Sequence, residues 1–210
     1  MVHTPPRLPD VGAASLGFRV KSGRAIAVLL VVSTDSLYVL DRREINLCDP
    51  AVPQSRQPYH AKMGTLQTNE ATIKRLRSVV MEAAEQSASE LLKDYGVRGH
   101  PVHTAGLVVG SETDPTTITN THIRAHAHEG QLFRTALEEA LRLLGLPYLV
   151  FVERKIYAGA AKTLNRPEED LKRILAGLGR RKSGPWRSDE KTAALAAWLT
   201  FQKIHSKSLN

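Results

Sequence analysis

The sequence predicts an α/β fold in which one β-sheet is covered by helices. Apolar segments with short connections fill the first fifty residues, which is typical of an antiparallel meander. From there to the end, segments with helical periodicity alternate with short apolar runs. The chain has 210 residues, of which 42% are hydrophobic and 24% charged, as is ordinary for a globular protein with a sizeable core.

Three strands are expected first. They cover about residues 14–21, 24–33 and 37–47, and turn-forming residues join them at 22–23 and 33–36. Residues 48–64 contain too many prolines for regular structure.

Helices and strands alternate after this irregular segment. The first helix is capped by Thr68 or Asn69 and ends at Gly96. The elements expected after it are a buried strand over 104–110, a helix over about 121–144, a strand over 147–153, a helix from Pro167 to about 177 and a last helix over 189–205. The apolar stripe expected along the helix over 121–144 consists of His126, Gly130, Phe133, Leu137, Ala140 and Leu144.

One domain is expected over residues 14–205, with a flexible, proline-stiffened lead-in over 1–13 and a tail over 206–210. Cys48 is the only cysteine, so no internal disulfide is expected and a reducing compartment fits. The longest apolar run, 25–32, is far shorter than the roughly 20 residues of a membrane helix. We therefore expect a cytoplasmic protein without a membrane partner.

Positive charge is concentrated near the C-terminus. The formal net charge is +8, and residues 151–210 hold 13 Lys and Arg against 6 Asp and Glu. This asymmetry favours a polyanion as the partner of the last third of the chain. A solvated basic face that only aids solubility is the alternative.

Two short stretches carry a family resemblance. Leu16-Gly17-Phe18-Arg19 ends the first strand, and Asp189 begins a last helix that continues through an alanine-rich run to Ala196. Together with the order of elements, they resemble the RuvC-like branch of the RNase H-like superfamily, which includes Holliday-junction resolvases. The resemblance implies a mixed five-stranded sheet, a three-strand antiparallel meander plus two parallel strands, flanked by helices. It also implies a nucleic-acid partner and a homodimer.

The chain departs from the acidic motif of that family. Arg19 stands where the family has its first metal-binding Asp, and Thr192 stands where the second acid of the last helix belongs, whereas Asp189 matches the first. Divalent cations need oxygen ligands and compensating negative charge. An arginine about 4 Å away would repel a dication by roughly 8 kcal/mol at an effective dielectric near 20. The departures favour a relative without two-metal hydrolysis.

Other acids keep a divergent nuclease open as an alternative. The catalytic candidates of that alternative are Glu112, Asp114, Glu153 and Asp189, which would need Mg²⁺ or Mn²⁺. Each has an ordinary explanation as well. Asp114 fits turn chemistry, Asp189 fits the first turn of a helix, and Glu153 fits an ion pair with a neighbouring arginine such as Arg19.

Basic residues and one tryptophan are the candidates for nucleic-acid contacts. They are Arg19, Lys21, Arg24, Arg154, Lys155, Arg180, Arg181, Lys182, Trp186 and Arg187. No base-reading motif accompanies them, so we expect contacts to the backbone of DNA or RNA. A lid over the core is a more common role for such a tryptophan than a stacking platform for bases.

Histidines offer a rival chemistry. His122 and His126 are spaced i, i+4 on a helix, a spacing at which two imidazoles can share a metal. His128 lies nearby, and His60 lies in the irregular segment before the first long helix. The sequence fixes no third ligand, so we assign no metal site and no cofactor. The leading hypothesis is a nucleic-acid-binding protein that lacks two-metal nuclease activity. The alternatives are a divergent metal-dependent endonuclease acting on branched or structured nucleic acid, and a protein-interaction module on the same scaffold.

Overall fold

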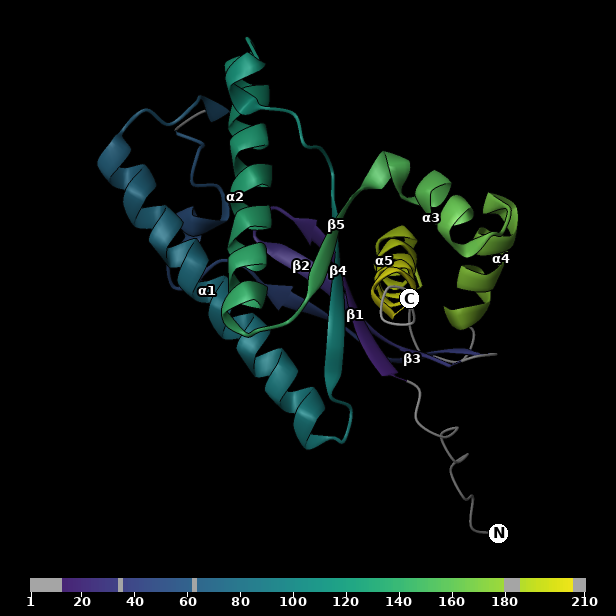
Figure 1. Ribbon diagram of the computed structural model, residues 1–210. Helices are drawn as coiled ribbons and strands as arrows, with labels where there is room; N and C mark the ends of the chain where they lie inside the picture. Colours follow the sequence, from purple (N-terminus) through teal and green to yellow (C-terminus); the bar gives the residue numbers. More distant parts are fainter. Residues whose placement is uncertain (1–12, 34–35, 62–63, 180–185, 206–210) are drawn as a thin grey trace.

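A computed structural model describes residues 13–33, 36–61, 64–179 and 186–205. One β-sheet lies between two layers of helices (Figure 1). Helices α1 (Glu70–Val97) and α2 (Thr121–Leu143) cover one face, and the helices that follow β5 cover the other.

The sheet has five strands in the order β3-β2-β1-β4-β5. The strands are β1 (Ala13–Lys21), β2 (Arg24–Val32), β3 (Leu37–Asn46), β4 (Val102–Val109) and β5 (Tyr148–Val152). The first three pair antiparallel, β4 runs parallel to β1, and β5 runs parallel to β4. The predicted mixed sheet is therefore confirmed.

Three helices follow β5: α3 (Ile156–Leu164), α4 (Glu168–Leu178) and α5 (Ser188–His205). Single-turn 3₁₀ helices lie at Pro53–Arg56 (η1), Pro115–Thr117 (η3) and Glu153–Lys155 (η4). The sequence predicted α4 and α5 but missed α3, which has only nine residues and follows β5 through the single turn of η4. None of the helices in the described part of the chain has an apolar stretch sufficient to span a lipid bilayer.

The ends of the two long helices follow from their capping residues. The side chain of Asn69 accepts a hydrogen bond from the backbone N–H of Thr72 (2.8 Å), and Asn120 does the same for Ile123 (3.0 Å). Each bond satisfies a backbone donor that has no partner inside the helix. The start predicted for α1 is thus confirmed, with Asn69 as the cap.

The buried face of α2 differs from the predicted stripe. Phe133, Leu137 and Ala140 are buried as expected, but His126, Gly130 and Leu144 are exposed. A strict 4-3 repeat has a period of 3.5 residues and drifts around a straight helix of 3.6 residues per turn. The remaining buried positions are Ala125, Glu129, Leu132, Ala136 and Leu141. A carboxylate, Glu129, is therefore enclosed with the apolar residues.

The two faces of β1 serve different cores. Leu16 and Phe18 belong to the cluster under α1 and α2, whereas the alternate residues face α5. Two of the strand residues under α5 are glycines. A Cβ on Gly17 would overlap the Ala193 carbonyl group of α5, and one on Gly106 of β4 would lie 2.6 Å from the Ala196 carbonyl carbon. The backbone of α5 therefore lies directly on β1 and β4, which places the start of α5 beside the end of β1.

We predict that Gly17→Ala lowers the free energy of unfolding by about 3 kcal/mol or more, because the added methyl group meets helix backbone that has no room to move. Gly159→Ala is the matched control, since a Cβ on this exposed glycine of α3 meets no atom within 4 Å. The control should stabilise the protein by up to about 1 kcal/mol. Chemical denaturation of both variants checks this, and equal effects would contradict the close approach of α5.

Candidate functional site

The candidate site lies at one edge of the sheet. Strands β1, β4 and β5 are parallel, so their carboxyl ends meet at the same edge, and the antiparallel β2 begins there. The ion pairs of Asp189 with residues of β1 place the first turn of α5 at this edge too. Four of the described candidates, Arg19, Lys21, Glu153 and Asp189, therefore come together although they lie far apart in the sequence.

Arg19 is the buried centre of this edge. Its side chain is 5% exposed, and its guanidinium forms a two-bond ion pair with Glu153, in which Nε donates to Oε1 (3.2 Å) and Nη2 donates to Oε2. Nη1 donates to the backbone oxygen of Val20 (2.7 Å). A buried guanidinium needs such partners because an unpaired charge in a desolvated site is strongly unfavourable. The expected pairing of Arg19 with Glu153 is confirmed.

Asp189 joins the same charge cluster from α5. Its Oδ1 lies 3.8 Å from Arg19 Nε and 3.1 Å from Lys21 Nζ. Two cations of β1 thus face two carboxylates, one from η4 and one from α5. We call Arg19, Lys21, Glu153 and Asp189 the edge cluster. Its formal charges balance without any added ion.

Thr192, one turn beyond Asp189, takes no part in the edge cluster. It is buried, and its hydroxyl donates to the backbone oxygen of Ser188 within α5 (2.7 Å).

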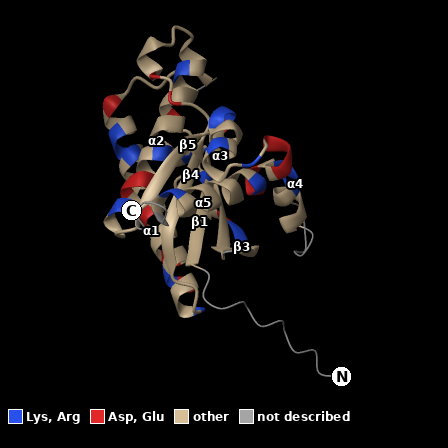
Figure 2. Ribbon diagram, turned by 45° about the vertical axis from the view of Figure 1, so that its right-hand side comes forward, with Lys and Arg blue, Asp and Glu red and all other residues tan. Residues whose placement is uncertain are grey.

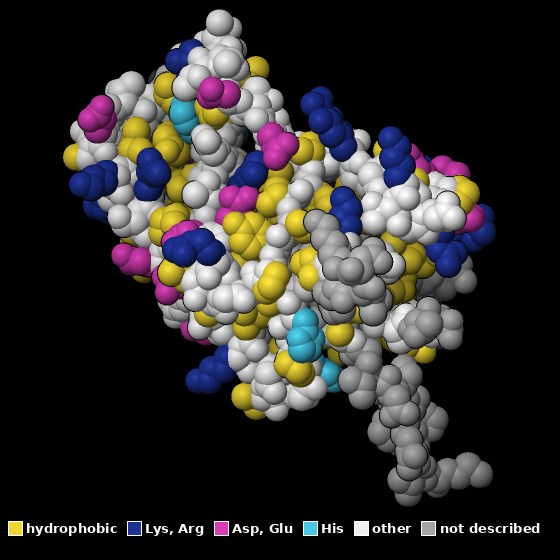
Figure 3. Space-filling model, viewed as in Figure 1, with side chains coloured by type: hydrophobic (Ala, Val, Ile, Leu, Met, Phe, Trp, Pro, Cys, Tyr) yellow, Lys and Arg dark blue, Asp and Glu magenta, His cyan; other side chains and the backbone are white. Residues whose placement is uncertain are grey.

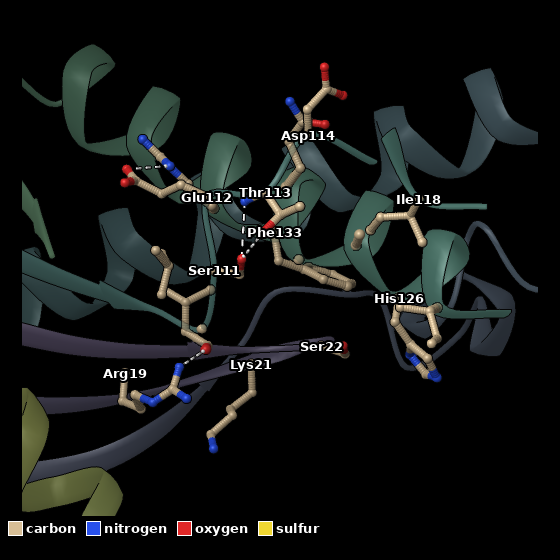
Figure 4. A pocket seen from close by; sticks show the side chains of 18 residues that line it. Arg19, Lys21, Ser22, Ser111, Glu112, Thr113, Asp114, Ile118, His126 and Phe133 are labelled. Atoms are coloured by element: carbon tan, nitrogen blue, oxygen red, sulfur yellow. Dashed lines mark hydrogen bonds and ion pairs between the residues drawn. The ribbon is translucent and has the colours of Figure 1, made fainter. Parts of the chain in front are cut away.

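The two remaining acidic candidates have other partners. Glu112 Oε1 accepts a bond from Nη1 of Arg134 on α2 (3.0 Å). Asp114 caps η3 by accepting a bond from the backbone N–H of Thr116 (2.9 Å), which lowers the pKa of its carboxyl. Figure 4 shows Asp114 pointing away from Arg19 and Lys21. Glu112 and Asp114 therefore do not join the edge cluster.

A cleft of about 780 Å³ separates these acids from β1. Arg19 and Lys21 line one side, and the loop after β4 and the exposed side of α2 line the rest (Figure 4). Apolar side chains such as Ile118, Ile123 and Phe133 contribute to its walls. The cleft thus combines buried positive charge with apolar surface.

Further cations surround this edge. Arg154 and Lys155 are exposed in η4, directly after Glu153. Figure 2 shows basic segments of the ribbon where β5 passes into α3, and in Figure 3 basic side chains stand out from the surface over this region. Arg24 forms an ion pair with Glu44 (3.2 Å) and lines a smaller cavity of about 340 Å³ together with the exposed Arg187. Arg180, Arg181 and Lys182 lie outside the described residues.

The smaller cavity also contains arginines that the sequence reasoning missed. Arg42 and Arg43 line it from β3, beside Glu44, Asp189 and Glu190. Arg43 also forms ion pairs with Asp41 and, at 2.9 Å, with Asp94 of α1. Its positive charge is therefore partly neutralised within the protein. These two arginines are adjacent and flanked by Asp41 and Glu44, so the sequence around them carries no net charge.

Trp186 is held in place by the protein core. Its indole N–H donates to the backbone oxygen of Leu175 (2.7 Å), and its ring packs against the apolar cluster under α4 and α5. It is also in close contact with Gly179. This is the arrangement expected of a lid over the core.

A second group of side chains lies at the start of α2, where Figure 3 shows histidine on the surface. His122 and His126 face His60 from the segment before α1, and Glu129 is fully buried beside His60. Burial raises the pKa of Glu129, and burial together with His60 and His122 lowers the pKa of His126. The sequence named His122 and His126, but only the fold brings His60 to them.

No family model matches the chain, and no curated protein matches it. Among solved structures, RuvC of Thermus thermophilus in complex with a Holliday junction substrate is similar over 92% of this chain and 96% of that chain, with 12% identity and a TM-score of 0.53. Another structure of the Thermus thermophilus protein has the same coverage, 11% identity and a TM-score of 0.49. The yeast mitochondrial Holliday junction resolvase Ydc2 gives 13% identity over 96% of this chain and 85% of that chain, with a TM-score of 0.45.

Identities this low concern the fold alone. The sheet order and the match to the complexed Thermus protein agree with the fold that the resemblance implied. The chain therefore has the RuvC-like form of the RNase H-like fold.

Proposed function

We propose that the protein binds the backbone of structured or branched nucleic acid at the carboxyl edge of its sheet and does not hydrolyse it by a two-metal mechanism. The observation that carries this proposal is the edge cluster, in which Arg19 and Lys21 are paired with Glu153 and Asp189. Its geometry argues against two-metal hydrolysis, and the exposed cations around it supply the attraction for phosphate.

The edge cluster disfavours metal ions by charge and by geometry. Two-metal catalysis requires several carboxylates that converge on cations about 3.5–4 Å apart. Here Glu153 has both oxygens on Arg19, and Asp189 is shared between Arg19 and Lys21. A dication bound to Glu153 would have to displace the buried guanidinium of Arg19. That guanidinium would then lose its carboxylate partner and lie close to the positive charge of the metal ion.

Phosphate binding is supported by the exposed cations at the rim. Arg154, Lys155 and Arg187 are exposed around the edge cluster. Each contact between such a side chain and a phosphate releases counterions, which gives affinity without base specificity. The Thermus protein of the same fold is described as bound to a Holliday junction, so branched DNA is the first substrate to test.

Binding should weaken steeply with salt. We predict that changing Arg154, Lys155 and Arg187 together to Ala makes the slope of log affinity against log salt concentration less negative by about 1–3 units. The reason is that each phosphate contact contributes about −0.9 to this slope. Fluorescence anisotropy with labelled four-way junctions, duplexes and RNA hairpins measures the slope.

The matched control for this experiment removes the same charge elsewhere. Arg98, Arg142 and Arg173, changed together to Ala, remove three exposed arginines that pair with acids of their own helices. The control should leave the slope near that of the unaltered protein. Equal slopes for both triple variants, or no binding at about 50 mM salt, would favour the protein-interaction alternative.

With Mg²⁺ or Mn²⁺ the protein should cleave nicked, branched and hybrid substrates no faster than a blank. The reason is that the carboxylates of the edge cluster already neutralise Arg19 and Lys21. Cleavage that depends on divalent ions and disappears in both Glu153→Gln and Asp189→Asn would establish the endonuclease alternative. Cleavage that survives both changes would come from elsewhere and would leave the edge cluster inactive.

A further inference from the structure

We propose that His60, His122 and His126 bind one divalent transition-metal ion of the Zn²⁺ class. This inference does not rest on the proposed nucleic-acid function. The three histidines are the only group of at least three His, Cys, Asp or Glu side chains, among the residues that the structure describes, whose ligand atoms all lie within 4.8 Å of one another.

The three ligands come from two segments that the fold brings together. His122 and His126 are one turn apart on α2, and their Nε2 atoms lie 3.2 Å from each other. His60 precedes α1 in a short stretch held by a β-bridge to Leu66, and its ring centroid lies 4.5 Å from that of His126 and 5.3 Å from that of His122. An ion would tie this stretch to the start of α2.

Hydrogen bonds at the other ring nitrogens orient two of the imidazoles for a metal. His60 Nδ1 lies 2.6 Å from Oε1 of the buried Glu129, and His122 Nδ1 lies 3.0 Å from the backbone oxygen of Gly64. When the Nδ1 nitrogens donate these bonds, the Nε2 nitrogens present lone pairs. Metal-binding histidines characteristically have such a carboxylate or carbonyl on their second nitrogen.

Two buried side-chain atoms in and beside the histidines have no hydrogen-bond partner. His60 Nε2 and Glu129 Oε2 are both buried without a hydrogen-bond partner. A buried polar atom without a partner is unfavourable, and a bound ion is one of the standard explanations. The unpartnered nitrogen of His60 is the one left over after the bond to Glu129, as a ligand nitrogen would be.

The donor set selects the class of ion. Three imidazole nitrogens suit Zn²⁺, Co²⁺, Ni²⁺ or Cu²⁺ rather than Mg²⁺, which prefers oxygen ligands. In a tetrahedral zinc site, three protein ligands leave the fourth position for water or another exchangeable ligand. His126 also lines the cleft that contains Arg19 and Lys21, so an ion here would add positive charge to the same cleft.

The test uses untagged full-length protein that has been treated with a chelator and dialysed. Titration with Zn²⁺ in a calorimeter should give one ion per chain, and Co²⁺ should give the visible absorption of a low-coordinate nitrogen-ligated site. His122→Ala and His126→Ala should each weaken Zn²⁺ binding 100-fold or more. Both side chains belong to exposed residues, so circular dichroism should show folded protein in each case.

Two control variants carry histidines that lie outside the group. His128 on α2 stacks on Tyr59, with ring centroids 4.7 Å apart, and His103 is exposed on β4. His128→Ala and His103→Ala should leave the stoichiometry and affinity for Zn²⁺ unchanged. Loss of binding in these controls, or binding that persists in His122→Ala and His126→Ala, would overturn the proposal, as would the absence of stoichiometric Zn²⁺ or Co²⁺ binding.

Glu129 is a positioning residue in this site. In folded Glu129→Gln, the affinity for Zn²⁺ should fall about 10- to 100-fold, as expected for a lost carboxylate behind a histidine ligand. The Co²⁺ spectrum should persist at saturating metal because all three imidazoles remain. An unchanged affinity would remove Glu129 from the site.

Discussion

The ion pair between Arg19 and Glu153 decides what the edge of this sheet can do. The guanidinium of Arg19 lies at the end of β1, the central strand, and its Nε and Nη2 both donate hydrogen bonds to the carboxylate of Glu153. Because Asp189 and Lys21 extend the pair, two cationic side chains are held at this edge and two carboxylates balance their charge. In two-metal enzymes, the carboxylates of the site bind metal ions. In this protein the two carboxylates are paired with the side chains of Arg19 and Lys21.

The edge cluster depends in turn on how closely α5 packs on the sheet. Gly17 and Gly106 let the helix backbone lie directly on β1 and β4, and Ser15 strengthens the contact by donating to the backbone oxygen of Ala197 (2.9 Å). A larger residue at either glycine would push α5 away and carry Asp189 with it. The packing of the core and the chemistry of the edge are therefore coupled through one helix.

The sequence predicted the fold well where the patterns were local. Short turns defined the meander of β1 to β3, and Asn69 defined the start of α1. The position of Arg19 within its strand pointed to a cation among acids, and the pairing with Glu153 follows from the parallel arrangement of β1, β4 and β5.

Features that depend on tertiary contacts were not predictable in the same way. The nine residues of α3 are too few to show a helical repeat clearly in the sequence, and a carboxylate at position 129 gives no sign that it is buried. His60 is separated from His122 by 62 positions, so only the packing of α2 beside the segment before α1 reveals the group. The sequence therefore identified His122 and His126 as a pair but gave no reason to place His60 beside them.

Locating Mn²⁺ would show whether the pairing of Arg19 and Lys21 with Glu153 and Asp189 keeps divalent ions from these carboxylates. Crystals grown with millimolar Mn²⁺, measured for anomalous scattering, would give the position of any bound ion. We expect no peak between Glu153 and Asp189, with the guanidinium of Arg19 still paired with Glu153. A Mn²⁺ peak between those two carboxylates, with Arg19 displaced, would show that this edge binds metal after all.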